Sequence, residues 1–206
     1  MKRILCLLVI GLLLPVLQAA DGVETIVCIR HGEKTPTELG QLSVRGLNRS
    51  LALPDVLLSK FGTPEFIFAP DPAGEIQLKD GQPSCYIRPL ATIEPTAIRC
   101  QLPVNTRFGF TDIAGLDAEL RKPVYEHAVV FVSWEHLMLV KFVRHLVAGL
   151  GGDPAQVPDW PSKDYDSIYV VRIITHGGQE SVSFTIDHEE LGRLSDRFPL
   201  PASSAE

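Results

Sequence analysis

Three short apolar runs divide the first two thirds of the chain. They read "TIVCIR" at 25–30, "EFIFAP" at 65–70 and "AVVFVS" at 128–133, and each is rich in β-branched or aromatic residues. None of them alternates cleanly between apolar and polar positions, as a half-exposed strand would. Such runs are typical of a parallel sheet that is covered on both faces. The pattern therefore predicts three buried parallel strands.

Apolar residues recur at helical spacing between and after these runs. The predicted helices cover residues 42–61, roughly 90–100, 112–121 and 135–149. Gly62 is expected to end the first helix. Pro54 is expected to interrupt it, because proline has no backbone N–H for the helical hydrogen bond.

The last part of the chain has a different pattern. "SIYVVRIIT" (167–175) and "SVSFTID" (181–187) flank "HGGQE", which predicts a terminal β-hairpin. The segment 153–167 is expected to be a surface loop. Strands that alternate with helices predict an α/β fold, a three-layer α/β/α sandwich with a mostly parallel central sheet.

The two ends of the chain differ from this pattern. Residues 1–20 have a basic start, an apolar centre and small residues before position 21, which is the layout of a signal peptide. The alternative is an uncleaved anchor, but the apolar run is shorter than the about 20 residues that span a bilayer, and Gly11 and Pro15 break it. We expect cleavage near Ala20, one domain over 21–198, and a flexible tail over 199–206.

Charge and cysteine content narrow the choice of partners. The net charge is −6, and it becomes −8 without residues 1–20, which hold two basic and no acidic residues. A nucleic-acid partner is therefore not expected, and a phosphate-bearing ligand would need a local cluster of positive charge. Oligomeric state is left open. With the signal peptide removed, the protein would be periplasmic or secreted and would have no stable membrane span.

Three cysteines remain in the expected mature chain, and no spacing among them suggests zinc. Cys28 lies inside a predicted strand and is expected to be a core residue. A helix over 90–100 would separate Cys85 from Cys100 by about 15 Å at its rise of about 1.5 Å per residue, too far for a disulfide. We therefore expect free thiols.

Charged residues and histidines follow the predicted strands. Arg30 and His31 end the first strand, Arg88 lies in the connection after the second, and Glu135 and His136 follow the third. In an open parallel sheet, these positions meet at the carboxyl edge, where ligands bind. Arginine binds phosphate oxygens through charge-assisted hydrogen bonds, and a neutral imidazole is a nucleophile. The set predicts a site for a tetrahedral dianion.

At these residues, the chain resembles the histidine phosphatase superfamily, which includes the cofactor-dependent phosphoglycerate mutases. The resemblance rests on "IRHGEK", "LSVRGLNRS", the spacing from Ser84 through Arg88 to Thr92, and "VFVSWEH". It implies that His31 is phosphorylated during turnover, that Arg30 and Arg88 bind the phosphoryl group, and that His136 is the second histidine of the pocket. Neither a metal nor a cofactor is implied, and 21–198 would be the histidine phosphatase domain.

The sequence departs from the family pattern in three ways. Glu135 stands where many members have glycine, Pro89 replaces a small helix former, and no residue aligns with the mutases' proton-donating glutamate. Glu135 is the first candidate for the general acid. Its alternative role is purely structural, as a first-turn acidic residue behind Ser133 as a helix cap. Asp112 and Asp117 are outside candidates, expected instead to be a helix cap and a solvated residue.

Other conspicuous residues have simpler interpretations. Trp134 and Trp160 are expected to be hydrophobic cover. Glu33 and Lys34 are candidates to meet the rest of the substrate. Arg45 and Arg49 are expected on a solvated helix face, although the resemblance makes Arg49 a structural partner near the site. The remaining histidines are expected to have surface or packing roles, at positions His127, His145, His176 and His188.

The sequence thus predicts a phosphomonoesterase that works through phosphohistidine without a metal. A phosphomutase and a phosphate-binding protein without turnover are the alternatives. A metal-dependent hydrolase is a third, weakened by the lack of ligands at metal spacing. The substrate is expected to be a phosphorylated small molecule or a cell-envelope component. Sugar phosphates, lipopolysaccharide phosphates, nucleotides and phosphoproteins all remain open.

Overall fold

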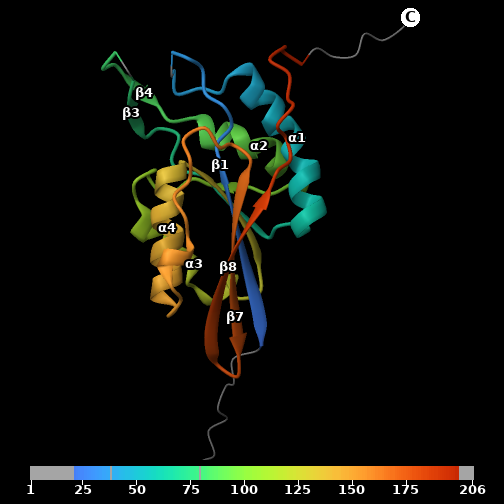
Figure 1. Cartoon of the computed structure of the whole chain (residues 1–206), viewed down its shortest axis with the longest axis vertical. Helices are drawn as coiled ribbons and strands as arrows, with labels where there is room; N and C mark the ends of the chain where they lie inside the picture. Colours follow the sequence, from blue (N-terminus) through green and yellow to red (C-terminus); the bar gives the residue numbers. More distant parts are fainter. Residues whose placement is uncertain (1–20, 38, 79, 200–206) are drawn as a thin grey trace, which may run out of the picture.

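The computed structural model describes residues 21–37, 39–78 and 80–199. The predicted signal peptide (1–20) and nearly all of the predicted tail lie outside these residues. Figure 1 shows a twisted central sheet with helices on both sides, α4 and α3 on one and α1 and α2 on the other.

The central sheet has six strands in the order β5-β2-β6-β1-β7-β8. β1 lies at its centre, parallel to β6 and antiparallel to β7. β2 is parallel to both β6 and β5, and β7 and β8 form the antiparallel terminal hairpin. The bounds are β1 Gly22–Arg30, β2 Phe66–Phe68, β5 Val104–Asn105, β6 Val129–Trp134, β7 Ser167–His176 and β8 Gln179–His188. The three parallel strands and the hairpin are confirmed, and β5 was not predicted.

The four predicted helices are also confirmed. They are α1 Val44–Phe61, α2 Arg88–Cys100, α3 Ile113–Leu120 and α4 His136–Gly149. Two single-turn 3₁₀ helices, η1 Pro123–Tyr125 and η2 Pro154–Gln156, and a two-stranded ribbon, β3 Glu75–Gln77 with β4 Pro83–Cys85, complete the fold. In the described part of the chain, no helix is long and apolar enough to cross a bilayer.

Alternate residues of β1 face the two helical layers. Val27 and Ile29 pack with Leu53 and Leu57 of α1 on one face, in a cluster that includes residues of α2. Ile26 and Cys28 lie on the other face, in the cluster that holds α3 and α4 residues, among them Leu116, Leu139 and Phe142. Burial on both faces explains why the sequence of β1 does not alternate.

The prediction that Pro54 interrupts the first helix is wrong. α1 continues through Pro54, which is itself buried. Leu53 and Leu57 are both fully buried against the sheet. This packing stabilises the helix despite the one hydrogen bond that proline removes. As expected, Gly62 ends the helix, with a φ of 79° and an N–H that donates to the carbonyl oxygen of Leu58.

Cys28, Cys85 and Cys100 are free thiols, as predicted. Cys85 ends β4 and Cys100 ends α2, so the helix separates them. Asp117 does not lie on a solvated face as predicted. It is buried and accepts a hydrogen bond from Nε of Arg121 at 3.1 Å, whereas Asp112 caps α3 as expected.

Candidate active site

The register of the central strands brings the predicted residues to one edge. Arg30 lies beside Trp134 where β1 and β6 both end, and the backbone N–H of His31 donates to the carbonyl oxygen of Trp134 at 3.0 Å. Glu135 and His136 follow Trp134 directly. Arg88 is the first residue of α2 and is close enough to His31 to lower its pKa. The edge thus gathers the predicted residues from three separate stretches of chain.

The backbone around His31 is fixed by hydrogen bonds. The N–H of Gly32 donates to Oγ1 of Thr92 at 2.9 Å, and this hydroxyl donates to the carbonyl oxygen of Arg88 at 2.8 Å. Nδ1 of His31 lies 2.8 Å from the carbonyl oxygen of Gly32. Because a carbonyl oxygen only accepts, Nδ1 carries the proton and Nε2 keeps its lone pair. The hydrogen bond therefore selects the tautomer that a nucleophilic imidazole needs.

Two glycines allow α1 to approach this loop. A Cβ atom on Gly46 would lie 2.4 Å from the carbonyl oxygen of Glu33, and one on Gly32 would lie 3.0 Å from the carbonyl oxygen of Gly46. The first separation is shorter than real Cβ contacts. The close packing explains the glycine in "LSVRGLNRS". It holds the start of α1 against the loop of residues 31–33 that follows β1.

Arg30 has one guanidinium nitrogen with hydrogen-bond acceptors and another without any. Its Nη1 donates to the carbonyl oxygens of Ser162 and Asp164 at 2.9 and 2.7 Å. The ring of Tyr165 stacks on the guanidinium, 3.9 Å from ring centroid to Cζ. Its Nε is buried and has no hydrogen-bond partner. Arg30 as a whole is 3% exposed. Its unpartnered Nε therefore faces the protein interior and not bulk solvent.

Arg88 has a matching arrangement. Its guanidinium lies over the ring of Tyr86, with Cζ 4.9 Å from the centroid. Its Nε and Nη1 are buried and have no hydrogen-bond partner. Buried guanidinium donors without partners are costly. Arg30 and Arg88 thus both have unpartnered donors close to His31, an arrangement that suits an oxyanion.

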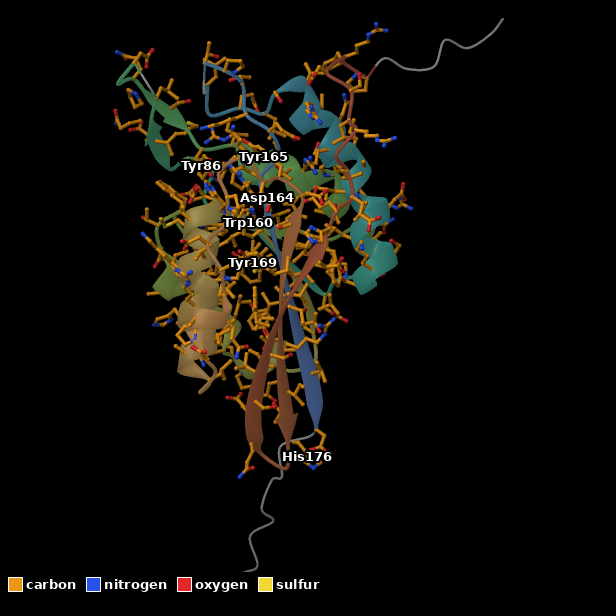
Figure 2. The ribbon with its side chains drawn as sticks, viewed as in Figure 1. Tyr86, Trp160, Asp164, Tyr165, Tyr169 and His176 are labelled. Atoms are coloured by element: carbon orange, nitrogen blue, oxygen red, sulfur yellow. The ribbon has the colours of Figure 1, made fainter. Side chains whose placement is uncertain are left out.

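Sequence reasoning missed the two tyrosines. The centroids of Tyr86 and Tyr165 lie 6.0 and 6.4 Å from that of His31. Figure 2 shows both rings at the same end of the sheet, while His176 lies at the opposite end. Tyr86 stands two residues before Arg88 and Tyr165 belongs to the predicted surface loop. No motif marked either of them.

Burial sets the protonation of His31. It lowers the pKa of His31 to about 3, and the positive charge of Arg88 acts in the same direction. His31 is therefore uncharged at neutral pH. Together with the Nδ1–H tautomer, this gives an imidazole whose Nε2 is available for attack.

Glu135 has the structural role that the sequence offered as one of two alternatives, as the N-cap of α4. One carboxylate oxygen accepts the N–H of Met138 at 2.9 Å, which caps α4. The other lies 2.5 Å from Nδ1 of His136. Burial raises the pKa of Glu135, but these contacts outweigh it and hold the pKa at about 2. Ser133 was expected to cap α4, but it lies inside β6 and donates to the carbonyl oxygen of Pro89.

Arg49 is buried rather than solvated. Its guanidinium donates to both carboxylate oxygens of Glu33, at 2.8 and 2.9 Å, and to the carboxylate of Glu189. Arg45 is 3.4 Å from the same Glu33. Glu33, in the loop that follows β1, is therefore held in an ion-pair network. Arg49 is the structural partner near His31 that the resemblance implies.

Three of the other histidines lie close to acidic residues outside this cluster. His176 is 2.8 Å from Asp21, His188 is 3.4 Å from Asp166, and the exposed His145 is 3.5 Å from Asp117. Within residues 21–37, 39–78 and 80–199, no three His, Cys, Asp or Glu side chains gather at metal-binding distance.

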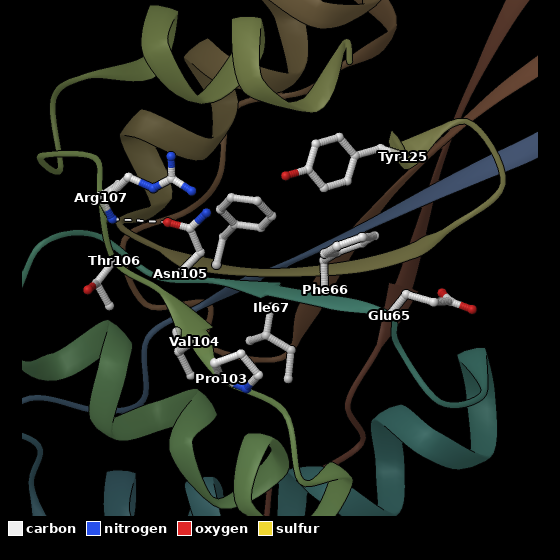
Figure 3. Close-up of a pocket in the computed structure, with 10 residues that line it drawn as sticks. Glu65, Phe66, Ile67, Pro103, Val104, Asn105, Thr106, Arg107 and Tyr125 are labelled. Atoms are coloured by element: carbon white, nitrogen blue, oxygen red, sulfur yellow. Dashed lines mark hydrogen bonds between the residues drawn. The ribbon is translucent and has the colours of Figure 1, made fainter. Parts of the chain in front are cut away.

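Two cavities differ in their relation to the site. The larger, about 540 Å³, lies at the β2–β5 edge; Figure 3 shows Phe66 and Tyr125 on one side of it and Asn105 with Arg107 at one end. None of the predicted site residues lines it. A smaller groove of about 350 Å³ includes Glu33, Arg45 and Tyr165. Because Tyr165 also stacks on Arg30, this groove, rather than the larger cavity, adjoins Arg30.

No protein-family model and no curated protein matches the sequence. Solved structures do match. A protein described as the phosphohistidine phosphatase SixA from Nakamurella multipartitia gives a TM-score of 0.54 at 14% identity, covering 81% of this chain and 96% of that one. A protein described as an alpha-ribazole-5'-P phosphatase from Escherichia coli gives 0.51 at 11% identity, covering 86% and 99%. The chain therefore has the phosphoglycerate mutase-like α/β fold, as the sequence predicted.

Proposed function

We propose that the chain is a phosphomonoesterase of the histidine phosphatase superfamily that works through phosphorylated His31 without a metal. One observation carries the proposal: an uncharged histidine that holds its proton on Nδ1 lies close to Arg30 and Arg88, two buried guanidiniums that each have at least one donor nitrogen without a partner. The order of the motifs along the chain and the shared fold support it. His136 is the second histidine that the family resemblance implies for the phosphate pocket.

In the first step, Nε2 of His31 attacks phosphorus and the bond between phosphorus and the leaving oxygen breaks. Arg30 and Arg88 bind the non-bridging oxygens and stabilise the charge of the transition state. In the second step, water attacks the phosphohistidine, the N–P bond breaks, and inorganic phosphate leaves. The Nδ1 hydrogen bond to Gly32 keeps the ring in one orientation through both steps.

Glu135 is the proposed proton-transfer group. As a carboxylate, it is ready to take a proton from the attacking water in the second step. The same group donates a proton to the leaving oxygen in the first step, by microscopic reversibility. It must gain that proton beforehand, and a bound dianion favours this because like charge raises the pKa of a carboxyl group.

The proposed substrate is a phosphorylated small molecule or a cell-envelope component, whose non-phosphoryl part occupies the groove beside Tyr165. The proposed location is periplasmic or secreted, from the leader pattern of residues 1–20. A phosphomutase and a phosphate-binding protein without turnover are the alternatives. Release of inorganic phosphate in excess chelator separates hydrolysis from transfer, from binding alone and from metal-dependent chemistry.

The test is a rapidly quenched reaction with a phosphate ester. We expect protein-bound phosphate that is labile in acid and stable in alkali, as a phosphoramidate is. His31→Ala should abolish the adduct and lower turnover by at least about a thousandfold. The matched control His145→Ala removes an exposed histidine and should change neither.

Two further variants assign the neighbouring groups. Arg88→Ala should weaken both phosphate binding and turnover, because its charge serves ground and transition states. Glu135→Gln should slow esters with poor leaving groups more than nitrophenyl phosphate, which needs little protonation. Full turnover by His31→Ala, or turnover only with an added divalent metal, would contradict the proposal.

A further inference from the structure

The two edges of the central sheet are built differently. The edge strand β5 has two residues, whereas the opposite edge strand β8 has ten. β8 pairs with β7 from Ser167↔His188 to His176↔Gln179 without a break in register. In the described part of the chain it pairs with no other strand. Figure 1 shows the β7–β8 hairpin reaching beyond the end of α4.

The turn of this hairpin determines which backbone groups of β8 face outward. Gly177 and Gly178 both have positive φ, 57° and 80°, and form a two-residue turn that closes on His176 and Gln179. Hydrogen-bonded pairs alternate along an antiparallel ladder. Odd-numbered residues of β8 therefore bond to β7, and the N–H and C=O groups of the even-numbered residues point away from the sheet.

β8 lacks the usual protection of an edge strand. Natural edges carry lysine, proline, a bulge or very few residues, which prevents pairing with another chain. β8 contains no lysine, arginine or proline, and the six residues from Ser181 to Ile186 are uncharged. Ile186 is 41% exposed. This edge is free to accept another strand along most of its length.

We infer that β8 pairs antiparallel with β8 of a second copy of this chain. Centred on Phe184, such a pairing places Val182 opposite Ile186 and Glu180 opposite His188 on both sides of the two-fold axis. Val182 then faces Ile186 in both halves of the pairing, Glu180 faces His188, and Asp187 faces the uncharged Ser181. The contact is closed and self-complementary, as a two-fold dimer requires.

The register also satisfies the backbone. Even-numbered residues face even-numbered residues across the axis, so their outward N–H and C=O groups bond to one another. An extended segment of another protein would satisfy the same backbone groups. A second β8 places Val182 opposite Ile186 in both halves of the pairing, which favours the second copy. The two six-stranded sheets would then form one continuous sheet.

The first test is the molar mass of the full chain over a concentration series, by sedimentation or light scattering. We expect it to rise from 22.6 kDa towards twice that value. Ile186→Lys and Ser183→Lys should each weaken dimerisation at least about tenfold, which corresponds to about 1.4 kcal/mol. Ser59→Lys puts the same charge on an exposed position of α1 and should leave the dimer unchanged.

The second test addresses the register. Ser183 and Thr185 of the partner strand would form a pair that is not hydrogen-bonded, with Cα atoms about 4.5 Å apart, close enough for a disulfide. Mixing Ser183→Cys with Thr185→Cys should give the 183–185 cross-link in peptide mapping, and neither variant alone should give it.

Unfolding midpoints show whether each variant keeps its fold. A one-chain mass at every concentration would overturn the inference. So would dimerisation of folded Ile186→Lys and Ser183→Lys as strong as that of Ser59→Lys, or an absent 183–185 cross-link.

Discussion

At the scale of single residues, Arg30 has one guanidinium nitrogen bound to the backbone and another without a partner. Nη1 is used up by two backbone carbonyls of the 153–166 segment, and the stacked ring of Tyr165 fixes the plane of the guanidinium. The orientation of the free Nε therefore depends on a side chain that does not itself bear charge. If Arg30 binds the phosphoryl group as proposed, Tyr165 acts as a positioning residue through its stacking on Arg30.

Tyr165→Leu should lower kcat/KM by about 5- to 30-fold, the equivalent of about 1 to 2 kcal/mol of cation–π stacking. Tyr165→Phe keeps the ring and should behave like the wild-type chain. Steady-state kinetics with a small aryl phosphate measure both, because such a substrate makes few contacts in the groove. An equal loss in both variants would assign the effect to the hydroxyl instead of the ring.

Residues of this kind set the limit of sequence reasoning. Arg30, His31, Arg88, Glu135 and His136 could be predicted because they follow strands or begin helices, and topology alone brings such positions together. Tyr165 could not, since its place over Arg30 depends on the path of a loop 135 positions further along the chain. The burial of Arg49 was equally hidden, because its partner Glu189 lies beyond the terminal hairpin.

At the scale of elements, Arg49 joins three segments. Its side chain extends from α1 to Glu33, in the loop that follows β1, and to Glu189, directly after β8. Glu189 is buried, and burial raises its pKa to about 8 against the lowering effect of Arg49. The guanidinium therefore stabilises two carboxylates that would otherwise oppose each other.

Above about pH 8, where Glu189 is ionised, Arg49→Ala should lower the free energy of unfolding by about 3 to 5 kcal/mol, because it leaves the carboxylates of Glu33 and Glu189 without their cation. Denaturant titration measures it. The loss should grow as pH rises, since at lower pH the raised pKa lets Glu189 take up a proton in the folded state. Arg45→Ala removes a half-exposed partner of Glu33 and should cost less than about 1 kcal/mol. Equal losses in the two variants would contradict this role.

The elements themselves were largely predictable from apolar spacing. The strands at the centre of the sheet and the four helices bury enough residues to leave a periodic pattern. β5 has only two residues and β3 and β4 have three each, too few for a period to be visible. Pro54 does not interrupt α1 because the packing of the whole buried helix face outweighs the one hydrogen bond that proline removes.

At the scale of the whole molecule, the proposal that the protein acts outside the cytoplasm rests on the leader pattern of residues 1–20. We expect cleavage close to Ala20, which would give an N-terminus near Asp21, directly before β1. Mass spectrometry of the protein isolated from its native cells measures the N-terminal peptide. Recovery of the chain in the cytosol with Met1 present would rule out export.

The position of β1 has a consequence for how the chain matures. β1 is the first strand to be synthesised, yet its partners are β6 at Val129–Trp134 and β7 at Ser167–His176. Contacts so distant in sequence form late and slowly. A nascent chain that stops before β7 cannot complete the centre of the sheet, so the loop with His31 has no fixed neighbours until most of the polypeptide exists. The strand order thereby delays the assembly of the groups that we propose to bind phosphate until β7 has been synthesised.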